Sequence, residues 1–120
     1  MPVISSLITS PFELVYSKRN FEIANGATWT SDVYNIDGWK SVIIVVVADG
    51  DLTVRSYQGP VGASSVSDMA EYFEWSYTGG SKTDNTCVDE VVLPVGMAYL
   101  ANSSGATVTV ESIYVYVKSS

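Results

Sequence analysis

The sequence of 120 residues lacks histidine and contains a single cysteine, Cys87. Because histidine is the usual general base for a serine or cysteine nucleophile, its absence excludes the common catalytic triads, and no Ser-x-x-Lys arrangement replaces it. One cysteine cannot form an intrachain disulfide, and neither zinc-ligand spacings nor a glycine-rich phosphate loop is present. We interpret Cys87 as a small core residue beside a strand, and we expect no cofactor.

Charge is also scarce, since charged residues make up 16% of the chain against about 25% in a typical globular protein. The six Lys and Arg residues are scattered and are outnumbered by thirteen Asp and Glu, which gives a net charge of −7. Binding to nucleic acid or to an anionic membrane surface needs several cations on one face, so we expect neither partner. The remaining surface residues are mainly Ser, Thr, Asn, Gly and Tyr, which suits a protein that packs against copies of itself.

Long hydrophobic runs are missing as well. The longest uninterrupted apolar run covers residues 42–48, far less than the ~20 residues of a membrane-spanning helix, so we expect no membrane insertion. Residues 1–10 lack the charged start and the long apolar core of a secretory signal, and we predict an N-terminal arm there and no signal peptide. Residues 11–120 have the size of one ordinary domain.

Strand patterns dominate the chain. Runs of β-branched and aromatic residues alternate with Gly, Asn, Asp and Ser clusters every eight to twelve residues, and only residues 66–74 can hold a helical turn. This spacing predicts an all-β, two-sheet antiparallel sandwich of jelly-roll-like type with eight to nine strands; a closed barrel is the alternative. The predicted strands cover residues 12–16, 28–36, 39–48, 52–58, 71–77, 87–93, 97–101 and 107–118.

The centre of the predicted sandwich is a hairpin over residues 39–58, which turns at Asp49-Gly50-Asp51. Its first strand does not alternate, because residues 42–47 are all Val or Ile. A strand with two apolar faces must be covered on both. We expect the facing sheet to cover one face, and a long loop or a neighbouring subunit to cover the other.

Aromatic residues are numerous, with three Trp, eight Tyr and three Phe. Exposed Trp and Tyr can stack on sugars or can form oligomer interfaces, although most aromatic residues pack in a core. Trp75 and Tyr77 precede the glycine-containing loop 78–85, so we expect them to be the most exposed. Trp75, Tyr77 and Tyr57 are therefore the candidate ligand or interface residues.

Acidic residues give two weaker candidate sites. Asp49 and Asp51, with Asp32 and Asp37, can supply oxygen ligands to calcium, but the EF-hand spacing is absent and Asp-Gly is a common turn dipeptide. Two carboxylates can also cleave glycosidic bonds, although acidic residues on strands usually face solvent. The candidates for such a pair are Asp89, Glu90, Glu74 and Glu111. We favour plain turns and solvated carboxylates, and expect a protein that is not an enzyme.

Two stretches of strands and turns resemble a known group. Residues 25–42, the apolar strand and residues 48–54, followed later by residues 98–110, are similar to a β-sandwich domain of structural proteins from bacterial and archaeal viruses. The middle of the chain, residues 59–92, departs from it. The resemblance implies a virion component made in the host cytoplasm: a capsid, decoration or turret protein, or a tail module. It carries over no catalytic residue.

We therefore expect a non-enzymatic virion structural protein. Its partners are copies of itself, in a homo-oligomer such as a trimer or pentamer, and other virion proteins. The alternative is a carbohydrate- or receptor-binding sandwich whose glycan contacts the candidate aromatic residues.

Overall fold

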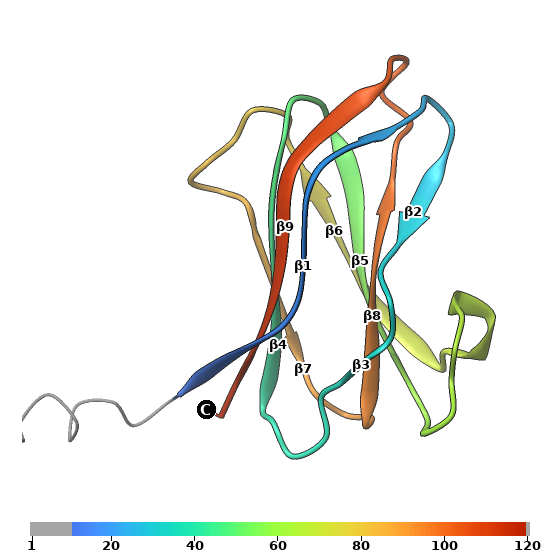
Figure 1. The fold of residues 1–120 in the computed structure, drawn as a ribbon, viewed down its shortest axis with the longest axis vertical. Coiled ribbons are helices and arrows are strands. Elements are labelled where there is room, and N and C mark those ends of the chain that lie inside the picture. Colours follow the sequence, from blue (N-terminus) through green and yellow to red (C-terminus); the bar gives the residue numbers. More distant parts are fainter. Residues whose placement is uncertain (1–10, 120) are drawn as a thin grey trace, which may run out of the picture.

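The computed structural model describes residues 11–119, so the predicted arm over residues 1–10 lies outside the described residues. Strands dominate the described chain, as predicted (Figure 1). No helix of this part is long and apolar enough to cross a membrane. The elements are β1 (Phe12–Ile23), β2 (Thr28–Thr30), β3 (Tyr34–Asn35), β4 (Ser41–Ala48), β5 (Leu52–Gly59), the 3-10 turn η1 (Val66–Asp68), β6 (Glu71–Tyr77), β7 (Thr86–Glu90), β8 (Val95–Ala101) and β9 (Val108–Lys118).

The strands form two packed antiparallel sheets. Sheet A has the order β1-β9-β4-β7, and sheet B has the order β2-β8-β5-β6, with β3 also paired to β8. The first long strand pairs with the last, β2 with β8, β4 with β7, and β5 with β6. This is an antiparallel ribbon rolled up so that its two halves face each other, which is the arrangement of a jelly roll. The predicted jelly-roll-like sandwich is therefore confirmed.

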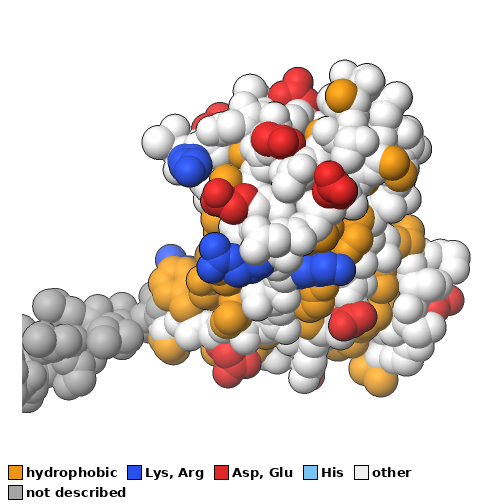
Figure 2. Space-filling view, turned by 45° about the horizontal axis from the view of Figure 1, so that its top comes forward, with side chains coloured by type: hydrophobic (Ala, Val, Ile, Leu, Met, Phe, Trp, Pro, Cys, Tyr) orange, Lys and Arg blue, Asp and Glu red, His pale blue; other side chains and the backbone are white. Residues whose placement is uncertain are grey.

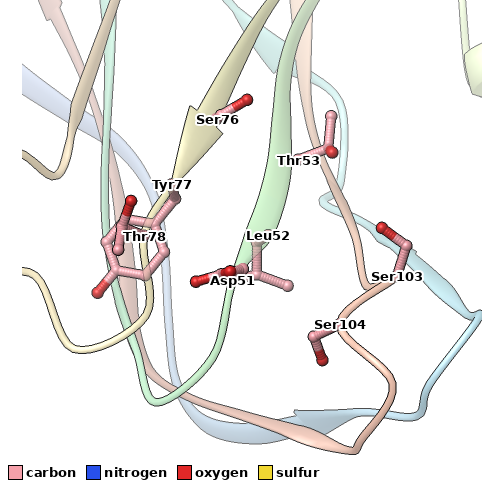
Figure 3. Close-up of a pocket in the computed structure, with 8 residues that line it drawn as sticks. All are labelled: Asp51, Leu52, Thr53, Ser76, Tyr77, Thr78, Ser103 and Ser104. Atoms are coloured by element: carbon pink, nitrogen blue, oxygen red, sulfur yellow. The ribbon is translucent and has the colours of Figure 1, made fainter.

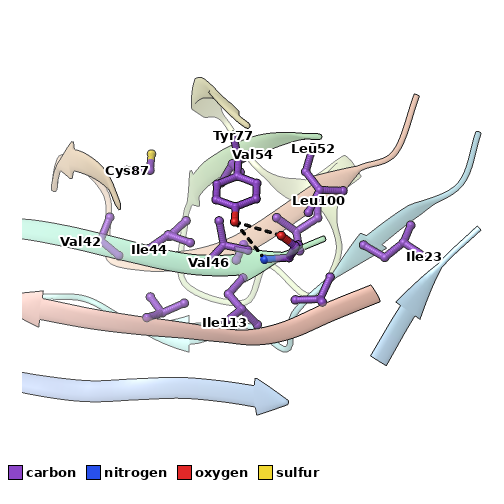
Figure 4. Close-up of a cluster of buried hydrophobic side chains, with 14 of the residues drawn as sticks. Ile23, Val42, Ile44, Val46, Leu52, Val54, Tyr77, Cys87, Leu100 and Ile113 are labelled. Atoms are coloured by element: carbon purple, nitrogen blue, oxygen red, sulfur yellow. Dashed lines mark hydrogen bonds between the residues drawn. The ribbon is translucent and has the colours of Figure 1, made fainter. Parts of the chain in front are cut away.

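The hydrophobic core lies between the two sheets (Figure 4). In β4 every second residue points into it, so Val42, Ile44 and Val46 are buried while the residues between them are half-exposed. From the opposite sheet, Leu52, Val54 and Leu100 close the core. Burying one such aliphatic side chain stabilises the fold by about 1.5–3 kcal/mol, so this layer supplies much of the free energy of folding.

The predicted hairpin over residues 39–58 is wrong. Its two strands exist, but β4 belongs to sheet A and β5 to sheet B, so the turn between them crosses from one sheet to the other. Asp49 pairs with Thr109 at the start of β9 through its backbone N–H and its Oδ1 atom. At Gly50 a Cβ atom would lie 2.5 Å from Val108 Cγ2, so the crossing needs glycine. A turn dipeptide marks a change of direction, but it does not specify which sheet the next strand joins.

Two strands differ from their predicted form. The predicted strand over residues 28–36 is split into β2 and β3. The predicted alternation of residues 107–118 also fails halfway, because Val110 and Ile113 both face the core. The paired strand β1 bends at the same level, where Asn20 has a positive φ of 56°. The strand predicted over residues 12–16 therefore extends to Ile23.

Candidate functional site: the two outer sheet faces and the loop-end pocket

Tyr77 is buried, so its predicted exposure is wrong. Its side chain points into the core at 2% exposure, opposite Leu52. The hydroxyl lies 3.1 Å from both the N and the O atom of Ala48 (Figure 4). It also lies 2.8 Å from the Ser81 carbonyl oxygen. The loop after β6 folds back over this ring instead of leaving it open. Tyr77 therefore holds a loop and the end of β4 together and is not a ligand platform.

Trp75 is half-buried and packs against the hydrophobic core from the edge strand β6. Its indole lies beside Tyr77, with ring centroids 6.2 Å apart. Residues 71–77 form the predicted strand, and their side chains alternate between its two faces. The face that carries Phe73, Trp75 and Tyr77 is the inner one, and the opposite face of β6 is the outer one.

Tyr57 lies on the outer face of sheet B within a cluster of aromatic residues around Arg55. The Arg55 guanidinium lies 4.3 Å from the ring centroid of Tyr72 and 5.1 Å from that of Tyr99. It also donates 2.8 Å hydrogen bonds to the Tyr57 hydroxyl and to Glu74 Oε1, and these bonds raise the pKa of Arg55 further above its usual range. We call these five residues the Arg55 cluster.

Sequence reasoning found Tyr57 but missed the rest of the Arg55 cluster. Tyr72, Glu74 and Tyr99 lie on three different segments, and only the register of β6, β5 and β8 brings them together. Tyr72 is the most accessible member, with 52% exposure, whereas Tyr57 has 7%. The cluster therefore presents one exposed tyrosine ring beside the Arg55–Glu74 ion pair.

A polar pocket of about 270 Å³ opens at one end of sheet B (Figure 3). Hydroxyl groups dominate its lining, which comes from the β4–β5 crossing, the end of β6 and the β8–β9 turn. Asp51 supplies its carboxylate, but the Oδ1 atom already accepts a 2.8 Å hydrogen bond from the Gly79 N–H. The lining residues are Asp51, Leu52, Thr53, Ser76, Tyr77, Thr78, Ser103 and Ser104.

Two of the four acidic calcium candidates brace the turn between β4 and β5. Asp49 accepts a hydrogen bond from the N–H of Thr109 at the start of β9, and Asp51 accepts one from the N–H of Gly79 in the loop after β6. In residues 11–119 no three His, Cys, Asp or Glu side chains come together as a metal-binding group. This arrangement fits the turn interpretation of Asp49 and Asp51.

Of the carboxylate-pair candidates, Asp89 and Glu90 lie on β7 and Glu111 lies on β9, all in sheet A. Glu74 is in the Arg55 cluster on sheet B, whereas the Oδ2 atom of Asp89 accepts a hydrogen bond from Gln58. The structure therefore does not bring Glu74 and Asp89 together. Cys87 is buried in the core as predicted, and burial, together with the charge of Asp89, raises the pKa of its thiol to about 12.

The outer face of sheet A is an apolar surface that spans all four strands. Leu14, Tyr116, Ile43 and Val88 stand in one row, one residue from each of β1, β9, β4 and β7. Leu14 and Val88, at the two ends of the row, are 48% and 56% exposed. We expected a loop or a subunit to cover the second face of β4, and the residues on this face are in fact half-buried within the sheet.

Charge is confined to the margins of this outer face. The neighbouring row consists of Ser17, Tyr114, Val45 and Thr86, so the two central rows carry no charged side chain. Lys118 and Glu90 stand in the row at one end, and Arg19 at the other. In Figure 2 hydrophobic side chains reach the surface beside the start of β1, and most of the acidic side chains in view lie in the upper half.

No family model matches this sequence. A search of curated protein sequences also finds no match. Two solved structures share the fold: infectious bursal disease virus Gt strain, with a TM-score of 0.53 and 11% identity over 92% of this chain, and the VP2 subviral particle of that virus, with 0.51 and 14% over 92%. This chain spans 32% and 33% of those chains. PirA gives a TM-score of 0.49 at 14% identity, over 88% of this chain and 95% of its own.

Proposed function

We propose that this protein is a non-enzymatic structural component of a virus particle that acts through self-assembly and protein–protein contacts. The observation that carries the proposal is the outer face of sheet A, whose two central rows hold no charge and include exposed Leu14 and Val88. The largest apolar patch on the surface of a soluble protein often marks a binding site.

The fold adds support of a second kind. Two matching structures with TM-scores above 0.5 are those of a virus and of its subviral particle, and jelly rolls are common in capsid proteins. The proposal extends to a capsid, decoration, turret or tail role in a bacterial or archaeal virus, on the resemblance in the turn and strand pattern. We place the protein in the virion, in contact with copies of itself and with other virion proteins.

Electron microscopy of the purified protein, combined with mass photometry, tests this function. The proposal predicts discrete assemblies of uniform size at high protein concentration, because repeated contacts of one type close into symmetric oligomers. A field of single particles of monomer size at every concentration would overturn it.

A glycan- or receptor-binding module is the second candidate, and the Arg55 cluster is the observation that favours it. The open ring of Tyr72 beside Arg55 and Glu74 offers stacking and charged hydrogen bonds on one sheet face. A glycan array tests this candidate with the wild type and Tyr72→Ala. Binding that Tyr72→Ala abolishes would favour it, and an array without signal for the wild type would remove it.

A further inference from the structure

We propose that the outer face of sheet A docks face to face onto the same face of a second copy of this chain, about a two-fold axis that runs parallel to the strands. The inference rests on the proposed self-assembly and deepens it by naming the surface, the partner and the symmetry. A two-fold contact is the commonest one in soluble oligomers, and it requires a surface that is complementary to itself.

The side-chain order across sheet A has this self-complementarity. A two-fold axis parallel to the strands keeps each row in place but reverses the strand order, so β1 faces β7 of the second copy and β9 faces its β4. Tyr116 then faces Ile43, and Leu14 faces Val88. Large aromatic rings on one column meet branched aliphatic side chains on the other, so apolar groups meet apolar groups along the row.

The charges at the margin follow the same symmetry. In the end row Lys118 faces Ser41 of the second copy. The Glu90 of that copy stands beside this Ser41 on the next strand, one strand spacing of about 4.8 Å along the sheet. Each copy supplies one lysine and one glutamate, so two such opposite-charge pairs form. An axis perpendicular to the strands would instead place Leu14 over Ser17, and Val88 over Thr86, which loses the apolar match.

The size of the face sets the strength of the contact. Three strand spacings and six residues along β4 give a patch of about 14 by 20 Å between backbone positions. Such a patch covers about 280 Å² on each partner, or about 560 Å² over both, which is smaller than the interface of a stable complex. We therefore expect a dissociation constant in the micromolar range or weaker, and a contact that becomes strong only when an assembly repeats it.

Two exposed valines provide a matched pair of variants. Val88 lies on the docking face, and Val61 lies in the β5–β6 loop with 82% exposure. By sedimentation equilibrium, Val88→Lys should weaken dimerisation at least tenfold, whereas Val61→Lys should leave it unchanged. Denaturant unfolding of both variants shows whether the monomer fold is intact.

Cysteine cross-linking in a Cys87→Ala background tests the axis. Facing sheets lie about 10 Å apart, too far for a direct disulfide, so a short bismaleimide is the cross-linker. It should cross-link a mixture of Leu14→Cys and Val88→Cys proteins into a dimer, and neither variant alone should be cross-linked. Cross-linking of Leu14→Cys to Ser17→Cys instead would overturn the proposed axis. Oligomers that neither cross-link through these pairs nor respond to Val88→Lys would overturn the docking face and leave the proposed structural function intact. Monomers at all concentrations would overturn both.

Discussion

The Gln58 side-chain amide, on β5 of sheet B, donates a 2.9 Å hydrogen bond to Asp89 Oδ2 on β7 of sheet A. The same amide nitrogen donates to the Glu90 carbonyl oxygen at 2.6 Å, and its oxygen accepts the N–H groups of Val92 and Leu93. Gln58 has 0% exposure, so its end of each of these bonds is shielded from water. One side chain thus ties the inner strand of one sheet to the edge strand of the other.

Replacing Gln58 by Met should destabilise the fold strongly. Methionine has a similar volume, but it leaves two donors and two acceptors without partners, and each unpaired buried group costs about 1–3 kcal/mol. Relaxation toward solvent at the edge strand reduces the sum, so we expect a loss of about 3 kcal/mol in the free energy of unfolding. Urea denaturation measures it, and a loss below about 1 kcal/mol would contradict the role of Gln58.

Two buried tyrosines should respond in opposite ways to loss of the hydroxyl. Tyr77→Phe removes a hydroxyl that contacts the Ala48 backbone and the Ser81 carbonyl, which should cost about 1–2 kcal/mol. The Tyr34 hydroxyl is buried with no hydrogen-bond partner, so Tyr34→Phe should leave stability unchanged or raise it. Equal losses in parallel thermal melts would show that the two environments are not as different as described.

In the Arg55 cluster, stacking on the tyrosine rings should contribute more to stability than the Arg55–Glu74 ion pair does. The Arg55–Glu74 pair is solvent-exposed, with side-chain exposures of 27% and 48%, so Glu74→Gln should change stability by less than about 0.5 kcal/mol. Arg55→Ala also removes the contact with two tyrosine rings and should cost about 1 kcal/mol or more. A double-mutant cycle between Arg55→Ala and Tyr72→Ala measures the stacking contribution. A second cycle, between Arg55→Ala and Glu74→Gln, should not contain this contribution.

Alkaline pH should destabilise the protein through Cys87. Its thiol pKa is raised to about 12 in the folded state by burial and by the charge of Asp89, whereas an unfolded thiol ionises near pH 8.5. The unfolded chain therefore releases its proton first, so the stabilising effect is complete below about pH 8.5 and declines as the pH rises toward 12. Burial raises the pKa of Tyr34 as well, and this adds to the decline above about pH 10.

Cys87→Ala is the control for this pH dependence, since it removes the thiol and should flatten the decline between about pH 8.5 and 10. The native thiol should also resist alkylation by iodoacetamide at pH 8 until the protein is unfolded, because the reactive thiolate is disfavoured. Rapid alkylation of the folded protein would contradict the burial of Cys87.

The sequence predicts the strands better than their partners. Alternation locates β6 and the apolar run locates β4, because side-chain periodicity is local. The sheet membership of β5 depends on Asp49 reaching Thr109, sixty residues away, and no local pattern records that contact. The exposure of Tyr77 failed for the same reason: alternation shows that residues 73, 75 and 77 share a face, but not that this face meets the core.

The candidate surfaces show the same limit. Tyr57 could be selected from composition, but Tyr72 and Tyr99 join it only through the registers of two strand pairs. The two apolar faces of β4 did predict an unusual outer surface, since Ile43 and Val45 have no core of their own to enter. Only the positions of β1 and β7 extend this outer surface into a face that spans four strands.

Sedimentation equilibrium of the unmodified protein, from about 1 µM to 1 mM, tests most directly whether this sandwich works by associating with copies of itself. We predict a mass that rises from the monomer value of 12.9 kDa toward that of a dimer or a larger closed oligomer, with half-association in the micromolar range or above. A mass of 12.9 kDa at every concentration would contradict it.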